Sequence, residues 1–189
     1  AAAAFARGSI HSPIEFQDVF FLAPLTFDAS ESGEVRVQLK RDQEVGAENS
    51  GFRFSVFARR GEWIEHSTGR IEPCPVRPAS KIDSAAIAAR CHEREVVFDE
   101  QHRTKQERYV DFGPRWHCLK RLCIGRYEGL AELALDNSVS ADSSAYHMHP
   151  ALLDLATGCS LYLTDGYESS DDLYFPFSYK KLCVYCTLP

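Results

Sequence analysis

The residues best suited to acid and base chemistry lie together in one short segment late in the chain. His147 and His149 come just before Pro150, and Asp154 follows four residues after that proline. Proline is suited to the first position of a helix, so we expect Asp154 to lie early in a helix that starts there. Carboxyl and imidazole groups often donate or accept protons in catalysis. An aspartate near a helix start can also simply interact with the helix dipole, which leaves a structural role open.

The seven cysteines are a second place to look for chemistry. Cys183 and Cys186 have the spacing of half a zinc site, and Cys118 with Cys123 could supply the other half. Residues three apart in a strand point to opposite faces, so Cys183 and Cys186 do not chelate together unless the strand is broken. We therefore expect no metal. Cys159 is expected to pack in the core, because no base is placed to activate it.

Composition limits the function classes. The 189 residues, 44% hydrophobic and 25% charged, fit one ordinary globular domain or two small ones. A net charge of -6, spread along the chain, leaves no basic stripe and argues against a nucleic acid partner. No apolar run of about 18 residues could span a membrane. The odd number of cysteines favours reduced thiols, so we expect a cytoplasmic protein.

The first half of the chain has the alternating pattern of half-buried strands at 34–40, 52–56 and 63–71. A polar stretch with two glycines at 42–51 predicts a long hairpin loop. The alanine-rich start, Ala1 to Arg7, favours a helix that Gly8 would end. We interpret this start as the end of a longer helix, so we expect a fragment or excised domain.

Three prolines at positions 73, 75 and 78 separate two unlike halves, because neither a helix nor a central strand tolerates that spacing. Ser84 is then predicted to cap a short helix at 85–91. A second strand-rich unit is expected to begin near Tyr109, with a helix from Pro150 to Leu163. Its strands are expected at 118–126, 129–135 and 179–187. Strands around one apolar helix indicate an α+β fold in which a sheet wraps a central helix.

The segment from Tyr146 to Asp154 resembles the second signature of polyketide synthase dehydratases, a His-Pro-Ala-Leu-Leu-Asp run that opens the central helix of the C-terminal hotdog. Residues 112–116, with an aromatic-Gly-Pro element, and residues 174–179 resemble further family segments in the family's order. In the first half, Val19 to Leu25 is similar to the strand after the N-terminal hotdog helix. Trp63, His66 and Gly69 are similar to the closing strand.

The resemblance implies a double hotdog of the α+β class, incomplete at both ends, with antiparallel sheets each wrapped around a central helix. On that view residues 1–75 are the remainder of the N-terminal hotdog, and residues 76–106 are a linker with a short helix. Residues 107–189 are then most of the C-terminal hotdog.

The resemblance also implies the reaction: removal of water from a 3-hydroxyacyl thioester on an acyl carrier protein, giving an enoyl thioester. Such a lyase needs a base for the proton next to the carbonyl and an acid for the departing hydroxide. Asp154 matches the family's acid. Burial among leucines would favour its protonated form and should outweigh the helix dipole, which favours the carboxylate by about 0.3 to 1 kcal/mol.

The remaining candidate residues concern the substrate. Tyr146 and His147 are expected to line the substrate channel, although packing at the helix entrance is an equal alternative. Phe112 lacks a hydroxyl and can only shape the pocket or pack, and Pro150 opens the helix beside the channel. His149, directly before the proline, is expected to be structural rather than the base.

The chain departs from the family in two ways. The first signature, a catalytic His with Gly four residues later and Pro five residues after that, is missing, because none of the seven histidines has Gly at that position. We expect this histidine upstream in a longer parent and expect the chain alone to be inactive. Gly158 stands where the family usually has Gln or His. Two alternatives therefore stay open: an enoyl isomerase or cyclase-like variant, and a non-catalytic scaffold or carrier-protein docking module.

The resemblance implies no cofactor or metal of the domain's own, because the substrate is carried on the phosphopantetheine arm of the acyl carrier protein. That carrier protein and neighbouring synthase domains are the expected partners, and the parent could be homodimeric. Acyl chain length and stereochemistry cannot be read from the residues.

Overall fold

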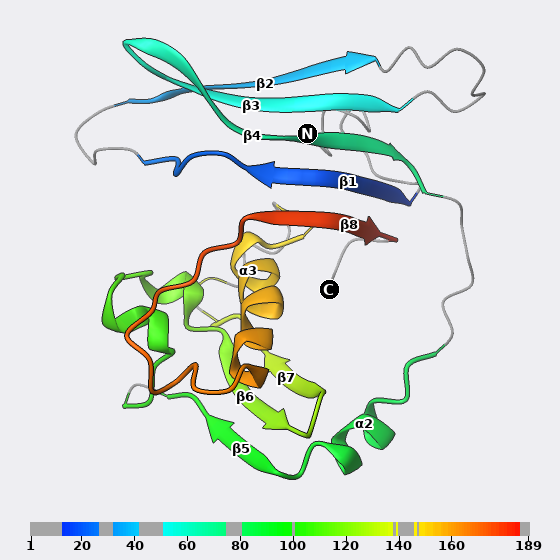
Figure 1. Cartoon of the computed structure of the whole chain (residues 1–189), viewed down its shortest axis with the longest axis vertical. Helices are drawn as coiled ribbons and strands as arrows, with labels where there is room; N and C mark the ends of the chain where they lie inside the picture. Colours follow the sequence, from blue (N-terminus) through cyan, green and yellow to red (C-terminus); the bar gives the residue numbers. More distant parts are fainter. Residues whose placement is uncertain are drawn as a thin grey trace. The chain divides into compact units, whose positions relative to one another are not determined.

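The computed structural model describes residues 13–26, 32–41, 51–74, 81–99, 101–137, 139, 146 and 148–185. It forms two compact units, one of residues 1–78 with 175–187 and the other of residues 79–174 with 188–189 (Figure 1). The expected helix at Ala1 to Arg7, most of the expected loop at 42–51, His147 and Cys186 lie outside the described residues.

The first unit contains a five-stranded antiparallel sheet in the order β2-β3-β4-β1-β8. Its strands are β1 (Ile14–Phe21), β2 (Glu34–Arg41), β3 (Phe52–Arg60), β4 (Glu62–Pro73) and β8 (Ser178–Val184). The alternating pattern predicted β2, β3 and β4, but Val35 and Val37 on β2 are exposed, so the buried apolar side chains of this sheet come from the other strands. Ile14 on β1, Ala58 on β3 and Ile71 on β4 are the most buried, at 2%, 3% and 0% exposed.

Strand β1 lies between β4 and β8, and Ile14 pairs with Pro73 on one side and Val184 on the other. It begins five residues before the expected strand start at Val19. The sequence pattern did not indicate this start, because Glu15 and Gln17 are polar. In the structure the Gln17 side-chain amide donates a hydrogen bond to the Glu15 carboxylate at 2.7 Å. The register against β4 shifts between Gln17 and Phe20, and Asp18 takes a positive φ of 47° at this bulge.

The second unit contains a three-stranded antiparallel sheet in the order β5-β6-β7. Its strands are β5 (Arg94–Val97), β6 (Leu119–Ile124) and β7 (Gly129–Leu133), and α3 (Pro150–Gly158) packs on it. One buried cluster joins helix and sheet, and it contains Cys118, Leu119, Ala151 and Leu155. The single expected helix to Leu163 is in fact α3 followed by a 3-10 turn, η4 (Cys159–Leu163). Gly158, a weak helix former, lies where the two meet.

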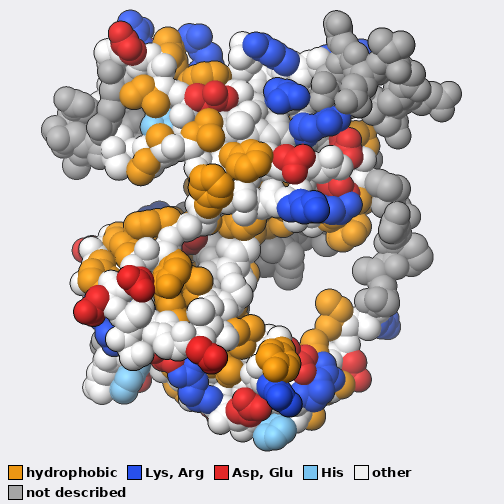
Figure 2. Space-filling view, in the orientation of Figure 1, with side chains coloured by type: hydrophobic (Ala, Val, Ile, Leu, Met, Phe, Trp, Pro, Cys, Tyr) orange, Lys and Arg blue, Asp and Glu red, His pale blue; other side chains and the backbone are white. Residues whose placement is uncertain are grey.

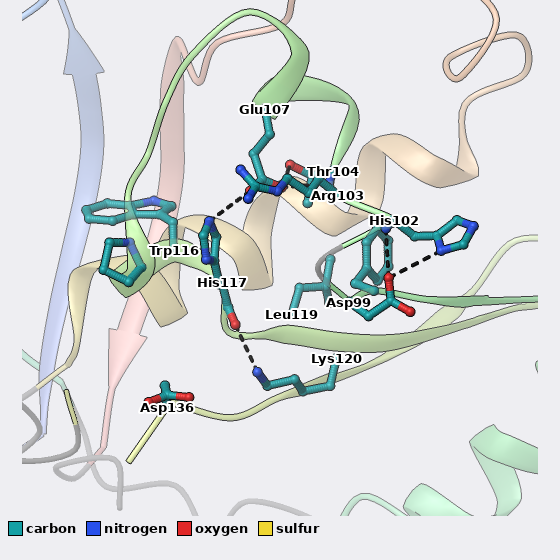
Figure 3. Close-up of a pocket in the computed structure, with 12 residues that line it drawn as sticks. Asp99, His102, Arg103, Thr104, Glu107, Trp116, His117, Leu119, Lys120 and Asp136 are labelled. Atoms are coloured by element: carbon teal, nitrogen blue, oxygen red, sulfur yellow. Dashed lines mark hydrogen bonds and ion pairs between the residues drawn. The ribbon is translucent and has the colours of Figure 1, made fainter. Parts of the chain in front are cut away.

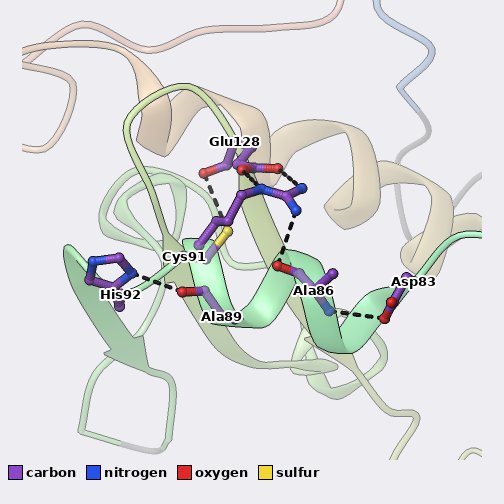
Figure 4. A network of polar contacts seen from close by, with 7 residues as sticks. Asp83, Ala86, Ala89, Cys91, His92 and Glu128 are labelled. Atoms are coloured by element: carbon purple, nitrogen blue, oxygen red, sulfur yellow. Dashed lines mark hydrogen bonds and ion pairs between the residues drawn. The ribbon is translucent and has the colours of Figure 1, made fainter.

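Helix α2 (Ser84–Arg90) begins one residue earlier than expected, and its cap is Asp83 rather than Ser84. Asp83 Oδ1 accepts a hydrogen bond from the backbone N–H of Ala86 at 2.9 Å (Figure 4). At the other end, Arg90 donates two hydrogen bonds to the Glu128 carboxylate, at 2.5 and 2.8 Å. The β6–β7 turn approaches α2 so closely that a Cβ on Gly125 would lie 2.7 Å from the Arg90 carbonyl oxygen.

The compact units do not follow the expected boundaries at 75 and 106. Strand β5 lies inside the expected linker of residues 76–106, and β8, from the expected C-terminal hotdog, belongs to the sheet of the first unit. On the face drawn in Figure 2, basic and acidic side chains are interspersed on each unit. Among the described residues, no helix is both long and apolar enough to cross a membrane.

Candidate active site around Asp154

Asp154 is placed by the way α3 begins. His149 has the extended dihedral angles φ -63° and ψ 126°, because a residue before proline avoids the helical region. Pro150 is then the first helical residue, and the backbone N–H of Leu153 donates to the His149 carbonyl oxygen at 3.1 Å. Asp154 therefore lies just past the first turn, half-buried beside the core residues Ala151 and Leu155.

The side chain of Asp154 is held by Trp116. The indole Nε1–H donates a hydrogen bond to Asp154 Oδ2 at 2.8 Å, although the two residues are 38 positions apart. The donor is neutral, and the described part of the chain places no lysine or arginine within ion-pair distance of this carboxyl group. Among the described residues, the other carboxylate oxygen, Oδ1, accepts no hydrogen bond. The arrangement orients a carboxyl group without pairing it to a positive charge.

Trp116 is positioned by the turn that precedes it. Gly113 has a φ of 70°, a conformation that favours glycine, and Pro114 opens the short 3-10 helix η2 (Pro114–Trp116). Phe112 stacks on the Trp116 ring, with centroids 6.2 Å apart and an interplanar angle of 20°. The two segments that suggested a family from sequence, at 112–116 and 146–154, thus meet at Asp154.

Two cysteine thiols of the second unit have raised pKa values, which indicates that their surroundings are apolar. Burial raises the pKa of the Cys118 thiol, and the charge of Asp154 adds a smaller contribution in the same direction. Cys159 is half-buried, its thiol donates to the Ala156 carbonyl oxygen at 3.2 Å, and burial raises its pKa too. Neither cysteine has the lowered pKa of a nucleophile.

The other sequence-predicted residues lie at the helix entrance. The Tyr146 ring meets the His149 ring edge-on at 5.4 Å, and Tyr146 is 46% exposed. His149 is buried, and neither ring nitrogen has a hydrogen-bond partner among the described residues. Pro150 is exposed at the start of the helix. Phe112 stacks on Trp116, the residue that donates a hydrogen bond to Asp154.

Trp116 also lines a pocket of about 370 Å³ (Figure 3). In it, His117 Nε2 lies 3.2 Å from Glu107 Oε1, and the other Glu107 oxygen accepts two hydrogen bonds from Thr104. Trp116 lines this pocket, but Asp154 does not. The turn at Thr104 holds the His117–Glu107 pair, and among the described residues neither side chain forms a hydrogen bond or ion pair with Asp154.

Sequence reasoning gave no role to Trp116, the residue with the most direct contact to the candidate acid. The available signal was chemical: an indole N–H that is partly buried usually finds an acceptor. The sequence did not show which acceptor, because α3 and η2 are distant along the chain.

Comparisons with known proteins agree with the family resemblance seen in the sequence. A family model described as Polyketide synthase dehydratase N-terminal domain matches residues 82–189. Polyketide synthase PksN of Bacillus subtilis (strain 168) is 25% identical over 155 residues, which are 82% of this chain and 3% of that protein. Spectinabilin polyketide synthase system protein NorB of Streptomyces orinoci is 30% identical over 167 residues, 85% of this chain and 7% of that protein.

Among solved structures, the dehydratase domain from the CurF module of Curacin polyketide synthase has a TM-score of 0.81 and 27% sequence identity. The match covers 96% of this chain and 64% of that one. The chain thus spans a small part of the curated relatives and somewhat less than two thirds of the solved domain. The likeness confirms the expected α+β hotdog fold, with antiparallel sheets and few helices.

Proposed function

The chain belongs to the polyketide synthase dehydratase family, and we propose that its parent synthase uses it to remove water from a 3-hydroxyacyl thioester. The product is an enoyl thioester, and the acyl chain is carried on the phosphopantetheine arm of an acyl carrier protein. That carrier protein and neighbouring synthase domains are the partners in this proposal, which includes a cytoplasmic, homodimeric parent. Its relatives, two polyketide synthase proteins and one dehydratase domain, support this proposal.

In this proposal Asp154 is the general acid. The observation that supports the role is the 2.8 Å hydrogen bond from Trp116 to Asp154 Oδ2, which fixes the carboxyl group and leaves Oδ1 to carry the proton. The bond between the β-carbon and the hydroxyl breaks, and Oδ1 gives its proton to the departing hydroxide, which leaves as water. The proton from the α-carbon goes to a base, and the electron pair of that C–H bond forms the double bond.

The base belongs to the family's first signature, and no histidine of this chain matches that signature. The chain by itself is therefore proposed to lack half of the catalytic pair. His149 does not replace it: the residue is buried at the helix entrance, where its ring packs on Tyr146. Tyr146, His147 and Pro150 are proposed to border the substrate channel, while Phe112 shapes it by supporting Trp116.

Gly158 does not favour an isomerase or cyclase over a dehydratase. Its backbone has ordinary helical angles, φ -69° and ψ -29°, and a Cβ built there meets nothing within 4 Å. The backbone thus accepts the side chains that the family usually has at this position. Glycine at position 158 therefore leaves open space beside α3 and does not alter the helical backbone that carries Asp154.

The test is the change Asp154→Asn in an intact parent domain that contains the first signature. Asparagine keeps the size and still accepts the indole hydrogen bond, but it has no proton to give. The loss of general acid catalysis should lower kcat by about 100-fold to 10,000-fold. Formation of the enoyl thioester would be followed by mass spectrometry on the carrier protein.

His149→Gln is the matched control, because this side chain lies on the same helix entrance but has no assigned proton transfer. We expect it to lower stability by roughly 1 kcal/mol and to keep most turnover. Rates are compared at equal folded fraction. Wild-type turnover in Asp154→Asn, or a folded but inactive His149→Gln, would overturn the assignment of the acid.

A further inference from the structure

A second cluster of reactive side chains lies in the first unit and has no part in the proposed dehydration. It consists of Glu15 on β1, Cys74 just after β4 and Cys183 on β8, and their ligand atoms all lie within 4.8 Å of one another. Both cysteines are reduced. Their sulfur atoms lie 3.8 and 3.5 Å from the same oxygen, Glu15 Oε2.

Strand pairing explains why the three side chains converge. Glu15 is directly opposite Cys183 in the β1–β8 pair, so both side chains point to the same face of the sheet. The backbone N–H of Cys74 donates to the Pro13 carbonyl oxygen at 2.8 Å on the opposite side of β1. Pro13 and Glu15 are two residues apart and share a face, which places Cys74 on that face as well. Figure 1 shows β1 between β4 and β8.

The same spacing argues against a disulfide. Neighbouring strands are about 4.8 Å apart, so residues on the two strands that flank β1 are separated by roughly 9 to 10 Å at their Cα atoms. A disulfide does not bridge Cα atoms more than about 7 Å apart. A metal ion, however, can join two thiolates across the middle strand, with about 2.3 Å from zinc to each sulfur.

We propose that Glu15, Cys74 and Cys183 form a zinc site with two thiolate ligands and one carboxylate ligand. Two sulfur ligands and one oxygen ligand are a donor set that suits zinc rather than magnesium or calcium, which take oxygen alone. A water molecule completes the tetrahedron. Each thiol releases one proton to the solvent when it binds.

The charges of the cluster balance in both forms. Without metal, the Glu15 carboxylate is paired with the Lys181 ammonium group, whose Nζ lies 2.5 Å from Oε2. With zinc, two thiolates balance the two positive charges of the ion, and the pair of Glu15 and Lys181 is unchanged in total charge. Lys181 has a side chain that is 59% exposed, so it can move aside into water while Glu15, 6% exposed, stays in place. Gln17 holds the second carboxylate oxygen at 2.7 Å.

The site differs from the zinc pattern considered in the sequence. That pattern joined Cys183 to Cys186, three residues along one strand, and was rejected because the two side chains would point to opposite faces. Cys183 instead meets residues 109 and 168 positions away, which come together only when β4, β1 and β8 pair. No spacing motif in the sequence could have indicated this set.

The first measurement is a titration of the reduced, metal-free chain of 189 residues with Co²⁺, followed by displacement with Zn²⁺. Cobalt bound to thiolate absorbs light by sulfur-to-metal charge transfer, which zinc bleaches when it takes the site. We expect one equivalent of Co²⁺ to produce this absorption and one equivalent of Zn²⁺ to remove it. A titration without a stoichiometric charge-transfer band would overturn the proposal.

Variants locate the site. Loss of a partner outside the ligand shell already weakens metal binding by about 10-fold to 100-fold, so Cys74→Ser and Cys183→Ser should each weaken it by more than about 10-fold. Cys123→Ser is the control, because Cys123 is likewise a half-buried strand cysteine but lies in the second unit. Equal affinity in wild type and Cys183→Ser, or an equal loss in Cys123→Ser, would contradict the assignment.

A measurement on the wild-type chain tests the zinc site even if a variant does not fold. Zn²⁺ should slow the alkylation of Cys74 and Cys183, mapped by mass spectrometry, and leave that of Cys123 and Cys159 unchanged. If zinc protects neither Cys74 nor Cys183, the site is not formed by these residues.

Discussion

The two compact units give their carboxyl groups different partners. In the first unit the hydrogen bond from Lys181 is the main cause that holds the pKa of the Glu15 carboxyl below its usual value, and desolvation opposes it. In the second unit burial raises the pKa of Tyr162 to about 12 and also raises the pKa of Tyr167 and Cys118. Burial raises the pKa of the Cys74 thiol in the first unit as well, so the difference lies in the partner of each carboxyl group, an ammonium group for Glu15 and a neutral indole for Asp154.

The difference bears on the proposal that Asp154 is the general acid. A general acid has to hold its proton until the leaving group needs it. Asp154 has a neutral indole N–H as its partner, whereas Glu15 has an ammonium group at 2.5 Å. The first environment is compatible with proton donation, and the second favours a permanent carboxylate that can bind a cation.

After Asp154→Asn, the largest effect is expected from Trp116→Phe in an intact parent domain. Phenylalanine keeps the ring that stacks on Phe112 but removes the N–H that orients Asp154. Because small errors in the position of a catalytic group cost up to about 100-fold, we expect kcat to fall by about 10-fold to 100-fold. KM should change little, since substrate binding does not depend on this hydrogen bond.

Steady-state kinetics of the folded variant separate this role from simple packing. A variant that merely loosens the fold would lower the active fraction and leave kcat per folded molecule as it was. An unchanged kcat per folded molecule would show that Trp116 does not position the acid.

Tyr162→Phe tests whether the second unit depends on a neutral phenol. With a folded pKa of about 12 against the usual 10, the unfolded chain loses its proton first, so stability falls as the pH rises from 10 to 12. The tyrosine should cost roughly 2 kcal/mol of stability by pH 12, and phenylalanine should remove that part. Urea unfolding at several pH values measures it, with the exposed Tyr109→Phe as control. Equal alkaline slopes in wild type and Tyr162→Phe would contradict the account.

Glu15→Gln tests the first unit at the opposite end of the pH scale. Because the folded pKa is lowered, the carboxylate contributes stability that is present above the usual value of 4.5 and is lost as the pH falls through the lower folded value. The variant should therefore show a shallower loss of stability in acid. Glu62→Gln, at an exposed position of β4, should keep the wild-type slope. A wild-type slope in Glu15→Gln would mean that Glu15 is not held as an anion.

The smallest effect is expected from Gly158→Gln. Glutamine is the better helix former by about 0.5 kcal/mol, and the open space at Gly158 accepts its side chain. We expect a slightly higher melting temperature and unchanged packing around Asp154. A clear loss of stability would show that the junction of α3 and η4 needs glycine.

Sequence reasoning worked where a pattern is local. Alternation predicted β2, β3 and β4, and Pro150 predicted the start of α3, because each depends on residues close in the chain. Strand β5 was missed, since Arg94 to Val97 is short and half charged, and only its pairing with β6 makes it a strand. The same limit applies to the sites: Asp154 was chosen from its own segment, but Trp116 as its partner and Glu15 beside two thiols depend on contacts made only in the folded chain.

The most direct test of the central claim is a double-mutant cycle between Trp116 and Asp154 in an intact parent domain. If the indole acts only by orienting the acid, Trp116→Phe should lower kcat in the wild type and have no effect once Asp154→Asn is present. The double variant would then be as slow as Asp154→Asn alone. If Trp116→Phe lowers kcat by the same factor in both backgrounds, the two residues act independently, and Asp154 is not an acid held in place by Trp116.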